Sequence, residues 1–454
     1  MSQRLPNILL IMSLFGSPMV YGQHTSMYKN EISFGLQNTQ FISEAYAQTD
    51  HKTFQSFTAG YNNTDIEKRF FYADLHAQMY WKDSSLSTLN VKDLFFSFQV
   101  KKVNYRIGRS TYKWSELDKN FNLGVIQPVD RTTSLDLNQQ GLTGLFIEMQ
   151  NTPTLRSALF VSPLFIPDQG APFEIEAGSF KPVNPWFTSP PTNVLVNGNL
   201  TRVNYDFNTP EIGHVVQQKS IGLNLQYLES SFNGLDYGNG FSFNASFLYK
   251  PTEQLQLIYD GYLSPDLTIE TQITPVVNQH TVFAADAGYS FEWFNLVFSG
   301  IYEKQDFISV NEQETISLYE PQIIVSIAAQ FPTYELKNRL ALVHVNGGEK
   351  KVTGPLANYI QDWLPNRMPF KNAAKWELNY EWKGHFNLGF EYLASLSDSF
   401  STVKMNSSYF MTDNLKLSGK LLLIAAEVNA KQESSDFYNY QDNDQVQMGI
   451  TYVF

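Results

Sequence analysis

The chain ends in Gln445-Val446-Gln447-Met448-Gly449-Ile450-Thr451-Tyr452-Val453-Phe454, where apolar side chains alternate with mostly small or polar ones. Because successive side chains of an extended chain point to opposite faces, this period of two predicts a strand with one apolar face. That face carries Val446, Met448, Ile450, Tyr452 and Phe454. We therefore expect the last strand of the fold to run to the end of the chain.

The same alternation recurs earlier in the chain. Apolar stripes occur at 241–249, 255–259, 376–382, 386–392 and 415–423, and the opposite faces carry amides and charges, several of them at mid-strand. A soluble sandwich would bury the apolar face, leave the polar face in bulk water and need protected edges. An inside-out arrangement, with apolar side chains against lipid and polar ones around a wet lumen, accommodates these charges.

Connection lengths favour the inside-out arrangement. Tight turns at 411–413, 383–384, 332–333, 290 and 251–253 interleave with longer loops at 427–441, 347–372, 305–317 and 264–278. Short turns at one end and long loops at the other are typical of transmembrane barrels. We expect an all-β fold, a transmembrane antiparallel up-and-down β-barrel of about 18 strands, within a range of about 16–20. Keeping the alternation requires a barrel strand between 163 and 218, and residues 201–207 are the best candidate.

The N-terminus has the three-part layout of a secretory signal. Arg4 is basic, Ile8–Met12 are apolar, and Gly22 is a small residue at a plausible cleavage point. A membrane helix would need about 20 consecutive apolar residues, and no run in the rest of the chain approaches that length. We expect residues 1–22 to be a signal peptide and residues 23–454 to form the barrel.

Composition excludes several other classes. The chain has no cysteine, so it has no disulfide scaffold, no thiolate metal site and no cysteine nucleophile. A net charge of −12 argues against a nucleic-acid partner, and 15% aromatic residues argue against disorder. The seven histidines form no close ligand pair, and no HExxH or Gly-x-Ser-x-Gly motif occurs. We expect no enzyme, no catalytic residue, no metal and no cofactor.

The signal-like N-terminus, the alternating strands and the terminal Tyr452-Val453-Phe454 resemble a Gram-negative outer-membrane β-barrel of the porin-like kind. The resemblance implies a place in the bacterial outer membrane, among its lipids and lipopolysaccharide. It also implies that the barrel-assembly machinery reads Tyr452 and Phe454 as an assembly signal. The implied function is passive diffusion of small hydrophilic solutes, and porin-type barrels are often homotrimers. The alternative is a surface or envelope interaction protein whose barrel anchors recognition loops.

Two long segments, 113–140 and 163–198, are candidates for a constriction or plug in the lumen, because a wide barrel is not filled by side chains alone. The alternative is that they pack on the outer rim. The candidate constriction residues are Arg109, Lys113, Trp114, Asp118 and Arg131.

The alternation also assigns charged side chains to the lumen. The candidates are Asp93, Arg106, Asp260, Glu377, Glu381, Glu391, Lys416 and Lys420. Their small acidic excess, together with the acidic chain, predicts a mild cation preference that salt weakens. Basic residues from the long segments would reverse that preference if they reached the constriction.

Overall fold

The computed structural model describes residues 31–41, 53–63, 70–81, 87–130, 138–168, 170, 173–182, 192–196, 198–229, 240–308, 311–332, 336–357, 367–397, 400–426 and 444–454. The predicted signal peptide, residues 1–22, lies outside the described residues and stays a prediction. None of the helices in these ranges is long or apolar enough to cross a membrane.

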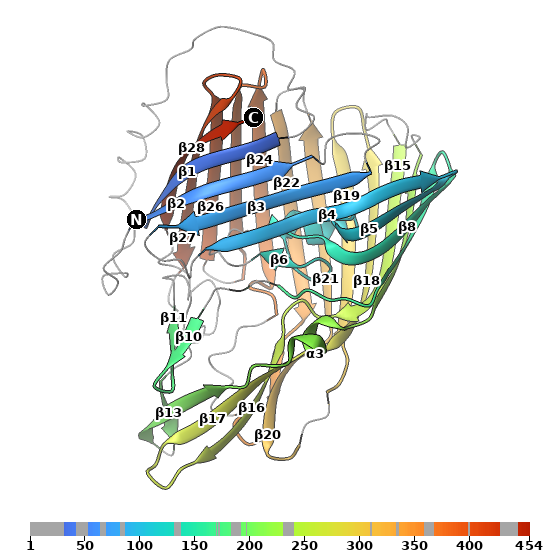
Figure 1. The fold of residues 1–454 in the computed structure, drawn as a ribbon. Coiled ribbons are helices and arrows are strands. Elements are labelled where there is room, and N and C mark those ends of the chain that lie inside the picture. Colours follow the sequence, from blue (N-terminus) through green and yellow to red (C-terminus); the bar gives the residue numbers. More distant parts are fainter. Residues whose placement is uncertain are drawn as a thin grey trace.

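Eighteen antiparallel strands close into a barrel, which confirms the predicted fold class (Figure 1). Each strand pairs with the next around the wall, and the first strand closes the ring by pairing with the last, with Gly35 opposite Thr451. In order, the strands are β1 (Glu31–Phe41), β2 (Thr53–Asn62), β3 (Phe71–Tyr80), β4 (Thr88–Val100), β5 (Val103–Ser110), β8 (Leu142–Thr152), β9 (Leu155–Ser162), β14 (Ser220–Leu228), β15 (Gly240–Pro251), β18 (Gln279–Ser290), β19 (Asn295–Gln305), β21 (Gln322–Pro332), β22 (Leu336–Gly347), β24 (Asn372–Trp382), β25 (Phe386–Ser395), β26 (Phe400–Phe410), β27 (Leu415–Ala426) and β28 (Gln445–Val453).

The outer face of the barrel is apolar. In β28 the exposed side chains are Met448, Ile450 and Tyr452, as the alternation predicts, and similar rows run along the other strands. Examples of these exposed apolar side chains are Phe34, Phe96, Leu223, Phe283, Phe298, Ile323 and Leu342. A continuous apolar belt on a closed barrel is the surface that a lipid bilayer covers.

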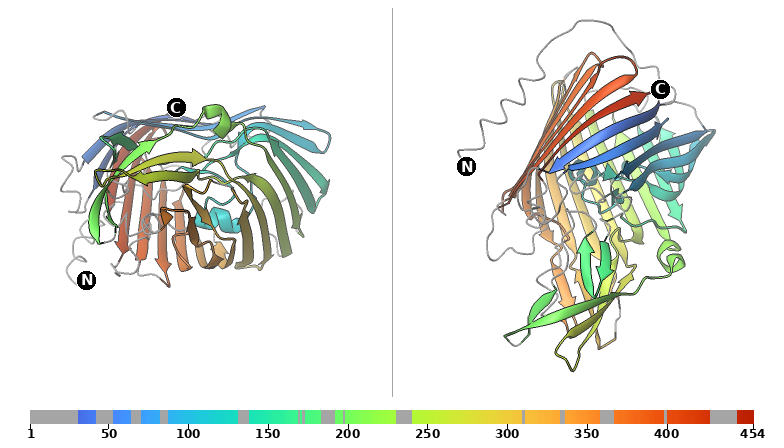
Figure 2. Two further views of the ribbon diagram at one scale, coloured as in Figure 1. Left: turned by 90° about the horizontal axis from the view of Figure 1, so that it is seen from below. Right: turned by 60° about the vertical axis from the view of Figure 1, so that its left-hand side comes forward.

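Short and long connections separate to the two ends of the barrel. At one end, tight turns join β4 to β5 and β26 to β27; at the other, the connections after β9, β15, β19 and β22 carry further strands. Six of these extra strands form a sheet beyond the long-loop end (Figures 1 and 2). Its order is β12 (Asn193–Val196), β13 (Asn199–Phe207), β17 (Ile269–Val276), β16 (Gln256–Leu263), β20 (Glu314–Tyr319) and β23 (Lys350–Thr353).

Two expected barrel strands belong to this second sheet. Residues 201–207 lie in β13, which pairs in parallel with β17, and residues 255–259 lie largely in β16. The assignment of both to the barrel wall was therefore wrong. Alternation alone could not separate them, because the second sheet also has one buried face, formed by Val203, Tyr205, Tyr259 and Ile273. The predicted number of about 18 barrel strands is still correct, because other segments of the chain supply strands of the barrel wall.

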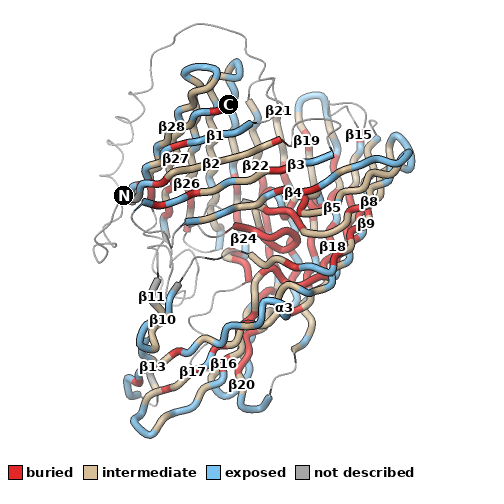
Figure 3. The backbone as a smooth tube through the Cα atoms, in the orientation of Figure 1, coloured by how far each residue is buried: buried red, intermediate tan, exposed pale blue. Residues whose placement is uncertain are grey.

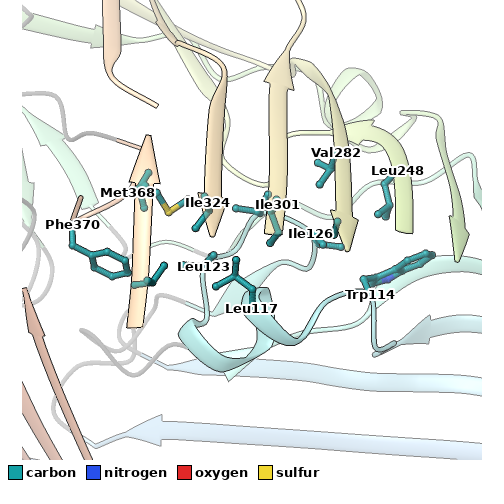
Figure 4. Packing of buried hydrophobic residues seen from close by; sticks show 14 of the residues in the cluster. Trp114, Leu117, Leu123, Ile126, Leu248, Val282, Ile301, Ile324, Met368 and Phe370 are labelled. Atoms are coloured by element: carbon teal, nitrogen blue, oxygen red, sulfur yellow. The ribbon is translucent and has the colours of Figure 1, made fainter. Parts of the chain in front are cut away.

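The segment between β5 and β8 turns into the barrel instead of covering its rim. It contains the short helix α2 (Glu116–Phe121) and two short paired strands, β6 (Val129–Asp130) and β7 (Asn138–Gln139). We call residues 111–130 and 138–141 the lumen segment. Its side chains Trp114, Leu117 and Ile126 pack on inward-facing apolar residues of the wall (Figure 4). Those wall residues include Phe146, Phe160, Leu248, Val282, Ile301, Ile324 and Val343.

This packing fills one side of the barrel with an apolar core. Figure 3 shows buried residues gathered around the lumen segment. It also explains why Ile323–Ala329 carries apolar residues on both faces, since Ile323 is exposed on the outer face while Ile324 is fully buried inside. Burial of apolar surface inside the barrel stabilises the lumen segment in place. The wall from β24 round to β1 lines most of what remains of the lumen.

Candidate functional site in the lumen

Helix α2 is held at both ends by charged side chains of the barrel wall. At its N-terminus, Asp286 of β18 accepts a hydrogen bond from the backbone N–H of Glu116 (3.0 Å) and one from the Ser115 hydroxyl (3.3 Å). At its C-terminus, Arg339 of β22 donates to Asn120 Oδ1 (2.6 Å) and the Lys375 ammonium donates to the Asn120 carbonyl. An acid at the N-terminus and bases at the C-terminus suit the partial charges of the helix ends.

The turn after the helix is built around a buried carboxylate. Asp118 accepts a hydrogen bond from the backbone N–H of Val125 (3.1 Å) and one from the side-chain amide of Gln139 (3.2 Å). Asn122 and Gly124 adopt left-handed backbone conformations, which lets the chain wrap around this group. Burial raises the pKa of Asp118 to about 6, although backbone N–H groups and Lys250 pull that pKa down.

Two groups fix the points where the lumen segment leaves and rejoins the wall. Asp93 of β4 accepts hydrogen bonds from the backbone N–H (2.5 Å) and the hydroxyl (3.1 Å) of Thr111. Arg109 is buried and donates to the Gly141 carbonyl (3.0 Å) and to Gln140. Gly108 has a φ of +133°, and a Cβ there would lie 2.3 Å from the Leu94 carbonyl oxygen, so this kink requires glycine.

A buried ionic network ties the segment to the long-loop end. Glu303 of β19 lies 2.7 Å from His280 Nδ1 of β18 and 3.1 Å from Arg367 Nη2. Arg367 also donates to the Gly124 carbonyl of the lumen segment (3.2 Å). The connection between β22 and β24 is therefore bonded to both the wall and the lumen segment. All three side chains are at most 3% exposed, so losing Arg367 would leave Glu303 as an uncompensated buried charge.

Beside the C-terminal end of α2, a chain of alternating charges crosses the wall. Glu377 lies 3.1 Å from Arg339 and 2.6 Å from Lys375, and Glu391 lies 3.1 Å from Lys375 and 3.6 Å from Lys404. Three bases therefore share two acids. Arg339, Glu377, Glu391 and Lys404 keep 16–25% of their side-chain surface exposed, so this row faces the remaining lumen.

Beyond this row, toward the short-turn end, the lumen is open. A cavity of about 640 Å³ lies along the inner faces of β22, of β24 to β28 and of β1. Lys337, Lys416, Lys420 and Glu381 are its charged lining residues. Its polar lining residues are Gln37, Asn379, Asn387, Asn406, Ser407, Ser408, Ser418 and Gln447. Such a wall suits water and hydrated solutes, because each polar group can exchange hydrogen bonds with what passes.

The eight sequence-predicted lumen residues lie in five different environments. Glu381, Lys416 and Lys420 line the open cavity, and Glu377 and Glu391 lie in the charged row beside it. Arg106 is on the inner wall opposite, 2.7 Å from Glu148, while Asp93 is buried at the start of the lumen segment. The expectation that Asp260 lines the lumen was wrong, because Asp260 lies exposed on β16, outside the barrel.

The constriction candidates mostly hold the segment in place instead of facing the open lumen. Trp114 is 1% exposed, Asp118 is 2% exposed, and Arg109 is 6% exposed. Lys113 is about half exposed and pairs with Glu116, and Arg131 lies outside the described residues. Of segment 163–198, the hairpin of β10 (Phe173–Glu176) and β11 (Ser179–Pro182) lies beyond the long-loop end (Figure 1). Asp168 of the same segment accepts a hydrogen bond from the backbone N–H of Val129 in the lumen segment (2.7 Å). The expectation that segment 163–198 narrows the lumen therefore stays a prediction.

Sequence reasoning missed the groups that shape the site. Asp286, Arg339, Lys375 and Lys404 were not selected, although each lies at an inward-facing strand position. Alternation could have identified these four residues. It could not show that the N-terminus of α2 lies against Asp286 and its C-terminus against Arg339 and Lys375. In the described ranges, no set of three or more His, Asp or Glu side chains is arranged to hold a metal ion.

The predicted assembly signal lies at the short-turn end. Tyr452 and Phe454 are both exposed, and their rings meet edge to face at 4.7 Å. Phe34 of β1 lies against Phe454 across the barrel seam, with ring centroids 5.9 Å apart. Recognition of these rings by the assembly machinery stays a prediction.

Comparison with known proteins yields structural similarity only. No protein-family model matches the sequence, and no curated protein matches it. Among solved structures, OccAB4 of Acinetobacter baumannii is 10% identical, with a TM-score of 0.45 over 94% of this chain and 99% of that one. The outer membrane protein opdK of Pseudomonas aeruginosa is also 10% identical, with a TM-score of 0.45 over 94% and 98%. OccK3 (OpdO) of Pseudomonas aeruginosa is 8% identical, with a TM-score of 0.46 over 94% and 95%. At such identities and TM-scores, none of these proteins identifies what this chain does.

Proposed function

We propose that the protein is a channel of the bacterial outer membrane for the passive diffusion of small hydrophilic solutes. The observation that carries the proposal is the asymmetric lumen. The lumen segment fills one side with an apolar core, while the wall from β24 to β1 keeps a polar cavity of about 640 Å³. A barrel that only anchors a surface domain can be closed, and its function does not require a cavity lined with lysines, amides and hydroxyls. An aqueous path requires such a lining.

The charges beside this path favour anions. The cavity carries Lys337, Lys416 and Lys420 against Glu381, and the adjoining row has three bases against two acids. On the opposite wall, Asp74 is paired with Lys92 (3.2 Å). The sequence-level expectation of cation preference depended partly on Asp260 and Asp93, which do not line the cavity. A positive wall concentrates anions, and the low-dielectric barrel around it strengthens that field.

The first test is electrical. The purified barrel, inserted in planar bilayers, should give stable open steps. Its reversal potential across a salt gradient should show anion preference at low salt that weakens as salt rises, because the Debye length falls to about 8 Å at physiological ionic strength. Lys416→Gln should reduce that preference, whereas Lys102→Gln, in the exposed turn between β4 and β5, should leave it unchanged. A sealed bilayer would reject the channel, and cation preference would reject the charge argument alone.

The six-stranded sheet supports a second candidate function, that of a surface interaction protein. Four separate connections converge to build this sheet beyond the barrel end, which is more structure than a diffusion channel needs. The alternative is a surface interaction protein that uses the barrel as an anchor for this sheet. The same bilayer experiment separates the two functions, since an anchor with a closed lumen gives no open steps.

A further inference from the structure

The open cavity contains an ordered row of side chains that crosses five strands. Lys337 of β22 lies opposite Asn379 of β24, and Asn379 lies opposite Gly389 of β25. Gly389 lies opposite Asn406 of β26, which lies opposite Lys420 of β27. All five residues line the cavity. We call them the lysine–asparagine row.

The middle of this row is a notch between two amides. Gly389 has no side chain, and a Cβ placed there would lie 3.2 Å from Asn379 Oδ1 and 3.9 Å from Asn406 Nδ2. The two asparagine side chains therefore flank the same point of the wall. A carbonyl oxygen and an amide N–H₂ that face one space can accept from and donate to the same hydroxyl-bearing molecule.

These amides are available for a solute. Within the described part of the chain, the side chains of Asn379 and Asn406 have no hydrogen-bond partner, and neither has that of Asn387 in the next row. By contrast, Gln447, which follows Lys420 in the row, bonds to Gln37 at 2.8 Å across the barrel seam. The free amides gather beside the notch, whereas the seam amides satisfy one another.

The ends of the row set the charge and length of the ligand. Four strand spacings of about 4.8 Å place the backbones of Lys337 and Lys420 roughly 19 Å apart, and their long side chains shorten that gap. The next row, from Glu381 through Asn387, Ser408 and Ser418, adds an acid, another amide and two hydroxyls. Neither row presents an aromatic or large apolar side chain to the lumen. A carboxylate at one end and hydroxyl groups beside the amides would satisfy this surface.

We propose that the lysine–asparagine row is a saturable binding site for small polyhydroxylated carboxylates, that is, sugar acids of the aldonate or uronate kind. The proposal rests on the channel function above and deepens it. Neutral sugars lack the charge for the lysines, and aliphatic or aromatic acids lack the hydroxyls for the amides. The site therefore prefers a solute that carries both groups.

The test is block of the ion current by added solute in planar bilayers. Gluconate should half-block the current at a concentration at least about tenfold lower than glucose or hexanoate. The double variant Asn379→Leu/Asn406→Leu should raise the half-blocking concentration of gluconate about tenfold and leave that of hexanoate unchanged. The double variant Lys337→Gln/Lys420→Gln should remove the preference for gluconate over glucose. Lys102→Gln is the matched control and should change nothing.

Several outcomes would overturn the site. Equal block by gluconate and hexanoate, or gluconate block that survives in the asparagine variant, would reject it while leaving the channel intact. If the barrel does not conduct, titration calorimetry of the detergent-solubilised protein with gluconate decides the matter separately. Gluconate binding that is lost in Asn379→Leu/Asn406→Leu would then support the site and reject only the channel. No binding in wild type would reject the site as well.

Discussion

At the residue scale, neighbouring positions of one strand meet opposite environments. On β26, Asn406 lines the cavity, whereas Met405 faces outward between Phe390 and Leu421 on the adjoining strands. Met405→Arg should lower the free energy of unfolding in lipid by about 2–4 kcal/mol, because the charge enters the middle of the apolar belt. Asn406→Arg should be nearly neutral, since it joins a wet wall. Urea unfolding in vesicles measures both, and equal losses would contradict the inside-out assignment.

At the scale of the element, the lumen segment depends on a carboxyl group whose protonation changes with pH. The pKa of Asp118 is raised from 3.8 to about 6 by burial, so the folded state binds a proton more tightly than the unfolded state does. The resulting stability is fully present below about pH 4 and is lost as the pH rises through 6. At about 1.4 kcal/mol per pKa unit, the loss is at most about 3 kcal/mol.

Asp118→Asn replaces the titratable carboxyl group with a neutral amide. The substitution should therefore flatten this part of the dependence of unfolding free energy on pH. The expected result is that the unfolding free energy of wild type falls more than that of the variant between pH 4 and pH 7. Urea unfolding at each pH, followed by tryptophan fluorescence, measures the difference. Identical profiles for the two proteins would show that Asp118 does not titrate in this range.

The elements also show how far the sequence alone could lead. β28 was predictable because the alternation of apolar and polar side chains is a local property of its own residues. β13 and β16 were misassigned because a sheet beyond the barrel shows the same alternation as a barrel wall. The lumen core was not predictable, since inward-facing Ile324 and Leu248 are apolar only because the lumen segment packs on them. Likewise, the notch at Gly389 depends on register across three strands, which no local pattern records.

At the scale of the whole molecule, we expect the wall from β24 to β1 to line an aqueous path. The chain contains no cysteine, so single cysteines can report on that wall without background. Asn406→Cys places a thiol in the cavity, and Met405→Cys, the adjacent residue in the sequence, places one in the apolar belt.

The most direct test is the single-channel current of these two variants before and after a charged, membrane-impermeant methanethiosulfonate reagent. We expect a stepwise fall in current for Asn406→Cys, because the group that the reagent attaches occupies the path, and no change for Met405→Cys. An unchanged current in Asn406→Cys, or an equal fall in both variants, would contradict a water-filled lumen along this wall.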